Sequence, residues 1–439
     1  MYYLIGIKGT GMSALAGILK DLGYEVKGSD NDNHYFTEEG LKEKNIEVLS
    51  YDPKNIQEGM YIIKGGAIKD DNPEVQRALE LGLKIHPYEE MVAKLTTMFQ
   101  TITIAGCHGK TTTTSMLSHV LDELRGANYL IGDGTGHASK ENKYFVLEAC
   151  EYKRHFLAYH PYYAIITNID LDHVDYYQGI DDVISAYTEY ANNAEKMVIA
   201  CGDDPYTHSL EVDKPIFYYG LDEDNDIIAK EVEYTENGTS FDVFIEDNYY
   251  GHFDLKLYGK HMLLDALAVI SFCYYERFEA KEVSKTLKTF EGAQRRFTEY
   301  PVLDNIVIDD YAHHPAEIRA TLKAVKQKYP SKDIVVVFGP HTYSRTEAFK
   351  DEYIEVLSKP SKTYIMDIYG ARENKEDFNI TSEDLIKEIP NAESISKDTI
   401  DKLLNHHNSV IIFMSANDVT ALEQEYIEKY KEQENEESK

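Results

Sequence analysis

The sequence predicts an α/β protein of three domains, and three observations support this fold class. The chain has 439 residues, which is too long for one ordinary domain. Apolar, β-rich runs alternate with helical sequence along most of its length. Glycine-rich turns follow the first strand of the first and second segments, where α/β proteins bind phosphate groups.

The first domain is expected to span residues 1–97 and to be Rossmann-like. An apolar run, a glycine turn, an amphipathic helix and a second strand ending at Asp30 form a βαβ unit. The pattern G-x-G-x-x-A from Gly9 to Ala14, with an acidic residue about twenty positions later, is the dinucleotide fingerprint. Taken alone, it indicates NAD, another phosphate-bearing ligand, or a plain tight turn.

The second domain, residues 98–297, opens with the strand "FQTITIAG". The later strands "YFVLEAC", "YAIITNI" and "EKMVIACG" are continuous apolar runs, as expected for parallel strands buried on both faces. Residues 231–259 instead alternate in polarity around Asn-Gly and Asp-Asn turns, which predicts a small antiparallel patch. Because the strand "FQTITIAG" runs into a short glycine loop and a helix, the domain is expected to be of the P-loop ATPase type.

The third domain, residues 298–439, contains the strands "NIVIDDY", "DIVVVFG", "KTYIMDI" and "SVIIFMS", each followed by helical sequence. This alternation predicts a doubly wound α/β sheet. Ligands of such sheets bind beyond the carboxyl ends of the strands. Polar residues gather at those ends, at Asp309, Asp310, His341, Asp367 and Asn417.

The stretch "IAGCHGKTTTT" at 104–114 resembles a phosphate-binding loop that is two residues short of G-x-x-x-x-G-K-[ST]. Backbone N–H groups at a helix N-terminus form a phosphate cradle. Lys110 would contact the outer phosphates and the Thr111 hydroxyl would bind Mg²⁺. The alternative is a glycine turn with a capping threonine.

Carboxylates and histidines at other strand ends are candidates for a second Mg²⁺, which prefers oxygen ligands. Glu148 follows one strand, and Asp172 and His173 follow another. Structural roles are the alternative for each. In "DDYAHHPAE" (309–317), a zinc site is weakly supported, and Asp310 binding ribose hydroxyls is more economical.

The arginines of "GAQRRF", Arg295 and Arg296, suit phosphate binding in so acidic a chain, although a solvated basic turn is equally compatible.

Charge and composition exclude several classes of partner. The net charge of −32 disfavours nucleic acid and anionic membranes. The sequence shows neither a signal peptide nor an apolar stretch of 18 residues. Four scattered cysteines favour reduced thiols in the cytoplasm. We expect a cytoplasmic monomer or weak homodimer that binds small molecules, without nucleic-acid or membrane partners.

The motifs, in this order, resemble the Mur ligase family, the ATP-dependent amide-forming enzymes of peptidoglycan synthesis. The resemblance covers nearly the whole chain and is closest to the branch that adds L-alanine to UDP-N-acetylmuramate. It rests on the motifs "GIKGTGMSALA", "GSD", "DNPEV", "GCHGKTTTT", "EACE", "TNIDLDH", "YGKH", "RRF", "DDYAHHPAE", "PHTYSRT" and "YGARE".

The resemblance implies an acyl-phosphate mechanism with ATP and Mg²⁺, two ions being expected. ATP would phosphorylate the lactyl carboxylate of UDP-N-acetylmuramate, and the amine of L-alanine would then displace phosphate. A related ligase that attaches a tripeptide to the same sugar is the rival within the family. An NAD-dependent dehydrogenase and a non-catalytic nucleotide-binding scaffold are rivals from other classes.

The resemblance also implies roles for individual residues. Lys110, Glu148 and His173 would be catalytic, and Thr111, Glu148 and His173 would hold metal. The ATP-binding residues would be Gly106, Cys107, His108, Gly109, Lys110, Thr111, Thr112, Asp265, Arg296 and Asp310. The first glycine loop would hold the UDP-sugar rather than NAD, through Gly9, Thr10, Gly11, Met12, Ser13 and Asp30. The amino acid or the substrate carboxylate would meet His313, His314 and Arg345.

Three motifs depart from the family pattern. Met262 and Asp265 stand where the family has asparagines that face adenine, and an ionised Asp265 could accept but not donate a hydrogen bond. The family's "GAGD" is "SANDV" here, and Thr342 replaces an arginine of "PHRYxR". The phosphate and metal positions are unchanged.

Overall fold

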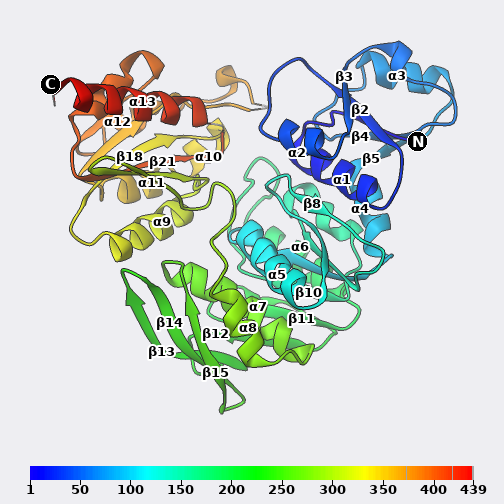
Figure 1. The fold of residues 1–439 in the computed structure, drawn as a ribbon, viewed down its shortest axis with the longest axis horizontal. Coiled ribbons are helices and arrows are strands. Elements are labelled where there is room, and N and C mark those ends of the chain that lie inside the picture. Colours follow the sequence, from blue (N-terminus) through cyan, green and yellow to red (C-terminus); the bar gives the residue numbers. More distant parts are fainter. Residues whose placement is uncertain (372, 418, 438–439) are drawn as a thin grey trace.

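The chain folds into three α/β domains, each built on its own sheet (Figure 1). The structure is a computed structural model that describes residues 1–371, 373–417 and 419–437. Arg372 of "YGARE" and Asp418 of "SANDV" lie outside the described residues. The predicted three-domain α/β architecture is confirmed.

The first domain is a five-stranded parallel sheet in the order β3-β2-β1-β4-β5, which is the order of the first five strands of a Rossmann fold. Helices α1 and α4 cover one face and α3 covers the other. The elements are β1 (Tyr2–Ile5), α1 (Thr10–Asp21), β2 (Val26–Asp30), α2 (Glu38–Glu43), β3 (Glu47–Ser50), β4 (Tyr61–Lys64), α3 (Pro73–Glu80), β5 (Ile85–Pro87) and α4 (Tyr88–Thr96).

The second domain is a ten-stranded mixed sheet in the order β15-β14-β13-β12-β11-β10-β6-β9-β7-β8. Its centre is parallel, whereas β13, β14 and β15 pair antiparallel, which confirms the predicted patch. Its strands are β6 (Gln100–Ala105), β7 (Ala127–Leu130), β8 (Gly136–His137), β9 (Tyr144–Glu148), β10 (Tyr163–Ile166), β11 (Met197–Cys201), β12 (Ile216–Gly220), β13 (Ile227–Thr235), β14 (Gly238–Ile245) and β15 (Asn248–Leu255). Its helices are α5 (Lys110–Arg125), α6 (Ile180–Asn192), α7 (Lys260–Tyr275) and α8 (Ala280–Leu287).

The third domain has a six-stranded sheet in the order β16-β17-β21-β18-β19-β20, parallel except for the edge strand β16. Helices cover both faces, as in a doubly wound sheet. Its strands are β16 (Thr298–Val302), β17 (Asn305–Asp310), β18 (Asp333–Gly339), β19 (Lys362–Ile365), β20 (Ala392–Ser394) and β21 (Ser409–Ser415). Its helices are α9 (Pro315–Lys328), α10 (Tyr343–Ala348), α11 (Lys350–Leu357), α12 (Ser382–Ile386) and α13 (Thr420–Glu437).

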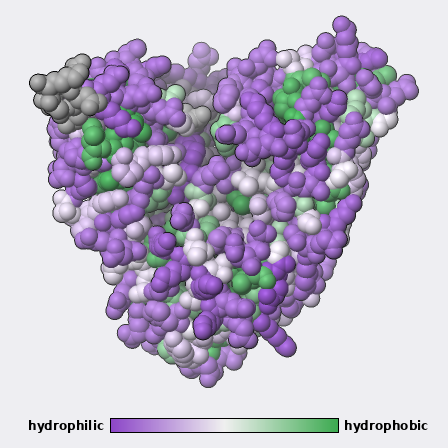
Figure 2. All heavy atoms as spheres, viewed as in Figure 1, coloured by the Kyte–Doolittle hydropathy of each residue, from purple (hydrophilic) through white to green (hydrophobic). Residues whose placement is uncertain are grey.

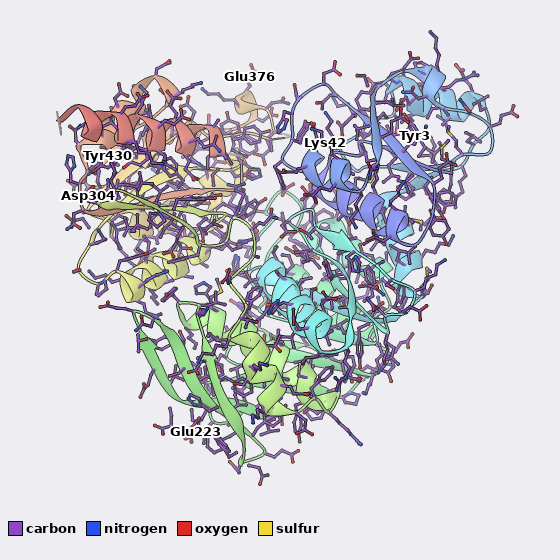
Figure 3. All side chains as sticks on the ribbon, in the orientation of Figure 1. Tyr3, Lys42, Glu223, Asp304, Glu376 and Tyr430 are labelled. Atoms are coloured by element: carbon purple, nitrogen blue, oxygen red, sulfur yellow. The ribbon has the colours of Figure 1, made fainter. Side chains whose placement is uncertain are left out.

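The last helix, α13, is fixed to this domain by tyrosines. Tyr426 and Tyr430 are fully buried, and each hydroxyl finds a polar partner at the start of β17. The Tyr430 hydroxyl donates to Asp304 Oδ1 at 2.6 Å, and both side chains are labelled in Figure 3. The tyrosine rings thus bury apolar area while their hydroxyls stay hydrogen-bonded.

The first two domains share a hydrophobic core, whereas the third meets the second mainly through polar contacts. One apolar cluster runs from α1 and α4 into the face of the second sheet that α6 covers. By contrast, Gln327 on α9 bonds to the backbone of Gly259 and of the β13–β14 turn. Hydrophilic residues dominate the face shown in Figure 2. Within the described part of the chain, none of the helices is both long and apolar enough to cross a bilayer.

Candidate active site

The shortened loop between β6 and α5 has a backbone that favours glycine at two positions. Gly106 has φ +149°, and a Cβ there would lie 1.9 Å from Thr167 Oγ1. Gly109, with φ +81°, caps the N-terminus of α5. Asn168 and Thr167 fix the loop through hydrogen bonds to the His108 backbone. The loop therefore presents a helix N-terminus, which is a site for phosphate.

Lys110, the first residue of α5, lies over this loop. Its Nζ donates to the Gly106 carbonyl oxygen at 2.5 Å and lies 3.0 Å from Glu151 Oε2. Burial opposes the charge on Lys110, but the carboxylate of Glu151 outweighs it and raises the lysine pKa. Lys110 is thus a fixed cation at the phosphate loop.

Two carboxylates reach the same point, one from the last residue of β9 and one from the loop that follows it. Glu148 Oε2 accepts from the Thr111 hydroxyl and from the Gly132 N–H, both at 2.9 Å. Glu151 is buried and faces both Lys110 and His173 Nε2, the latter at 3.3 Å. Burial raises the pKa of Glu151, but Lys110 and His173 outweigh it and keep the carboxyl ionised.

The structure thus brings Lys110, Thr111, Glu148 and His173 together in the lining of one cavity, and their catalytic and metal-binding roles stay predictions. The structure also places Glu151 in this group. Glu151 is part of the motif "EACE" but was not among the predicted site residues. The spacing of two glutamates three residues apart after a buried strand was the available indication. The oxygen donors of Thr111 and Glu148 fit a Mg²⁺ ion.

Two cavities meet at the loop. The three-domain cavity, of about 350 Å³, is lined by all three domains, including Thr10 and Phe36 of the first and His313, His341 and Arg345 of the third. The two-domain cavity, of about 460 Å³, lies between the second and third domains. Gly109, Arg296 and Glu317 line both cavities. A ligand held at the loop could therefore extend in both directions.

The two-domain cavity contains most of the expected nucleotide-binding side chains. Met262, Asp265, Arg296 and Asp310 all line it. The Asp310 carboxylate accepts from the Phe297 and Ala312 N–H groups. Burial raises the Asp310 pKa to about 6, against the effect of Arg296.

His108 connects the second and third domains. Its Nε2 lies 3.2 Å from Asp170 Oδ2 and its Nδ1 lies 3.4 Å from Glu317 Oε1 on α9. Burial lowers the His108 pKa, but the hydrogen bond to Asp170 and the nearby Glu317 carboxylate outweigh it and raise the pKa to about 9. His108 is therefore an imidazolium held between two carboxylates.

Arg345 makes a second connection between these domains. Its Nε and Nη2 donate to Asp172 Oδ1 at 3.0 and 2.9 Å, and both side chains are buried. Its Nη1 contacts His341. Arg345 lines the three-domain cavity, yet most of its donors are already used within the protein.

The paired histidines of "AHHP" take different positions. His313 lines the three-domain cavity beside Glu317, whereas His314 caps α9 and packs against the His108 ring, outside the lining of both cavities. Burial lowers the pKa of His313 to about 3 and that of His314 to about 4, so both are neutral. His108, Asp170 and His314 bring ligand atoms within 4.8 Å of one another. However, His314 Nδ1 accepts from the Ala316 N–H, which leaves the proton on Nε2 and opposes metal binding there.

Few of the expected UDP-sugar residues face the three-domain cavity. Thr10 lines it, and Ser13 lines a neighbouring cavity of about 400 Å³ between α1, α2 and the 133–136 loop. Met12 is buried in the core, and Asp30 accepts from the Lys8 and Asn31 N–H groups. Phe36, which no sequence motif indicated, lines the three-domain cavity and this neighbouring cavity.

Comparison with known families accounts for almost the whole chain. Residues 1–100 match the model described as Mur ligase family, catalytic domain. Residues 104–273 match the Mur ligase middle domain, and residues 295–418 match Mur ligase, glutamate ligase domain.

Solved structures of ligases are similar to this chain over most of its length. The chain is 26% identical to UDP-N-acetylmuramate-alanine ligase MurC from Thermotoga maritima, covering 98% of this chain and 99% of that one, with a TM-score of 0.83. It is 23% identical to a murein peptide ligase from Psychrobacter arcticus, covering 98% of both chains, with a TM-score of 0.73. MurF ligase from Thermotoga maritima, solved with ADP, shares 17% identity over 89% of this chain and 98% of that one, with a TM-score of 0.66.

Proposed function

The chain belongs to the Mur ligase family, and we propose that it joins L-alanine to the lactyl carboxylate of UDP-N-acetylmuramate with release of ADP and phosphate. One observation carries this proposal. Side chains of all three domains line a single cavity at the mouth of a phosphate loop, where Lys110 and Glu148 lie. A reaction that brings ATP, a sugar nucleotide and an amino acid together needs such a meeting point.

ATP is best accommodated with its phosphates at the 106–111 loop and its nucleoside in the two-domain cavity. The α5 N-terminus and Lys110 offer positive charge to the phosphates. Arg296 lines both cavities, and its contact with Glu317 is long, at 3.8 Å. It is therefore placed to neutralise phosphate charge, and Asp310 to accept from a ribose hydroxyl.

Thr111, Glu148 and His173 are the residues that would hold Mg²⁺, with Glu151 behind His173. Mg²⁺ supplies charge neutralisation between the γ-phosphate and the carboxylate that attacks it. Lys110 acts on the same charge, because Glu151 fixes its ammonium group at the loop.

The acceptor would enter from the third-domain side of the three-domain cavity. Phosphorylation turns a carboxylate oxygen into a leaving group, and the amine then attacks the carbonyl carbon and expels phosphate. His313 and Arg345 line that side, and Asp172 fixes Arg345 in place. Contacts between the second and third domains, such as Arg345 to Asp172, would shield the acyl phosphate from bulk water.

L-Alanine is favoured over a tripeptide for two reasons. The chain is 26% identical to the alanine-adding ligase from Thermotoga maritima and 23% identical to the murein peptide ligase from Psychrobacter arcticus. The three-domain cavity, of about 350 Å³, must also hold the γ-phosphate and the sugar carboxylate, which leaves room for a small acceptor. Convergence of Lys110, Glu148 and His173 argues against a non-catalytic scaffold, and against a dehydrogenase that would leave this loop unused.

The test is ATP- and Mg²⁺-dependent phosphate release with UDP-N-acetylmuramate, comparing kcat/KM for L-alanine, glycine, L-serine and the tripeptide. We expect release that requires the sugar nucleotide and is most efficient with L-alanine. Release only with the tripeptide would assign the enzyme to the rival reaction. Failure with every acceptor would support the scaffold.

A further inference from the structure

Asp265 is an acid in an unusual position beside the phosphate loop. It lies in the second turn of α7, is 5% exposed and lines the two-domain cavity. A Cβ built on Gly109 would lie 2.6 Å from Asp265 Oδ1. The carboxyl group therefore packs directly on the residue that caps α5, where the phosphates of a bound nucleotide would be held.

No cation among the described residues forms an ion pair with Asp265. On its own helix, Lys260 pairs with Asp203 at 2.9 Å, and burial lowers the pKa of His261 to about 4, so that this ring is neutral. On the phosphate loop and α5, His108 is held by two other carboxylates, and Thr113 offers a hydroxyl.

The remaining elements around Asp265 bring mostly acidic groups. From the segment before β16, Arg296 is a described cation that acts on Asp265, and it also faces Glu317. The other titratable groups on the cavity wall are Asp170, Cys201, Asp203, Asp204, Tyr206, Asp310 and Glu317, and Tyr219 lies close enough to interact with Asp265. Burial raises the Asp265 pKa to about 7, although Thr113 and Arg296 favour the ionised form.

Accepting the nucleotide site of the proposed function, we propose that Asp265 binds nucleotide as the neutral carboxylic acid, so that nucleotide binding takes up a proton. A neutral acid presents one donor and one acceptor, as an amide does, whereas a carboxylate only accepts. Phosphates arriving at Gly109 disfavour a second negative charge against the same residue. The neutral Asp265 can then donate and accept hydrogen bonds as an asparagine would, and the affinity for nucleotide becomes pH-dependent.

The sign of the pH dependence follows from linkage. Bound phosphate raises the pKa of Asp265, and by reciprocity ionisation of Asp265 weakens nucleotide binding. Above the pKa of the free protein, the affinity should fall by up to about tenfold per pH unit. Below it, the affinity should be independent of this group.

The experiment measures binding of MgADP to the full chain by calorimetry between pH 6.5 and 8.5, at saturating Mg²⁺. For the wild type, we expect Kd to rise on the order of tenfold across this range and proton uptake to approach one at the upper end. Asp265→Asn should bind with a Kd that varies less than about twofold, because an amide does not titrate. Asp203→Asn is the matched control, since Asp203 lines the same cavity but is paired with Lys260, and it should retain the wild-type pH dependence.

A flat wild-type profile, or a slope that persists in Asp265→Asn, would overturn the inference. Absence of MgADP binding by both proteins at every pH would instead remove the nucleotide site of the proposed function, and this inference with it.

Discussion

At the scale of single residues, the chemistry depends on how buried charges are paired. Lys110, Glu151 and His173 form one connected group, and Thr111 and Glu148 form another beside it. The phosphate loop and Glu148 could be predicted from the sequence because each follows a buried strand. The spacing of "EACE" could have indicated Glu151, but its contacts with Lys110 and His173 could not be predicted, because they depend on the turn after β9, where Lys153 and Arg154 adopt positive φ.

Replacing Lys110 should separate catalysis from substrate binding. Lys110→Met should lower kcat by about a hundredfold or more, because a preorganised cation at the developing charge is lost. Binding of UDP-N-acetylmuramate, measured by calorimetry, should change little, since the proposed sugar site is in the first domain. An equal loss of kcat and of UDP-N-acetylmuramate affinity would contradict the assignment of catalysis and sugar binding to separate loops. Glu151→Gln is the comparison variant. It removes the same ion pair but keeps the lysine, so its kcat should fall less than that of Lys110→Met.

Replacing Glu148 should change the metal requirement. Glu148→Gln should raise the Mg²⁺ concentration for half-maximal rate by about tenfold or more, because an anionic oxygen ligand is lost. Glu141→Gln, at an exposed position before β9, should leave that concentration unchanged. A Mg²⁺ titration of the rate that is identical for both variants would remove Glu148 from the metal site.

At the scale of elements, close packing of helices on strands joins the first domain to the second. Helix α1 lies against β8, and a Cβ at Gly136 would lie 2.3 Å from the Ala14 carbonyl oxygen. The long apolar strands and the antiparallel patch were predictable from periodicity. The short strands β7, β8 and β12 were not, because two to five residues with mixed polarity give no clear period.

Two glycine substitutions test this contact. Gly136→Ala should lower the free energy of unfolding by about 1–3 kcal/mol, because backbone must move to admit the methyl group. Gly40→Ala should raise it by about 0.5–1 kcal/mol, since a Cβ in this helix meets nothing within 4 Å. Thermal unfolding of both variants measures these changes. A Gly136→Ala protein as stable as the wild type would exclude close packing between Gly136 and α1.

At the scale of the whole molecule, both cavities form where the third domain contacts the second. Arg345 to Asp172 and His108 to Glu317 both cross this boundary. Sequence patterns predicted each sheet but not their mutual placement, which determines both cavities. His314 caps α9 and Asp30 accepts from the Lys8 and Asn31 N–H groups, and neither lines the two cavities. Their expected substrate roles stay predictions, as does a monomeric or weakly dimeric state.

The His108 bridge should make stability depend on alkaline pH. Its pKa is about 9 in the folded protein and about 6.5 when unfolded, so its contribution is fully present below pH 6.5 and is lost as the pH rises through 9. We expect about 2–3 kcal/mol from this group. The difference in unfolding free energy between the wild type and His108→Gln should therefore shrink from pH 7 to pH 10. A constant difference would mean that His108 is not charged in the bridge.

The central claim is that ATP activates the sugar carboxylate as an acyl phosphate within the three-domain cavity. The most direct measurement uses UDP-N-acetylmuramate labelled with ¹⁸O in its lactyl carboxylate, with ATP, Mg²⁺ and L-alanine, and determines the label in the released phosphate by mass spectrometry. Attack of the carboxylate on the γ-phosphorus transfers one of its oxygens, so each phosphate should carry one labelled oxygen. Unlabelled phosphate formed together with the amide product would contradict the account.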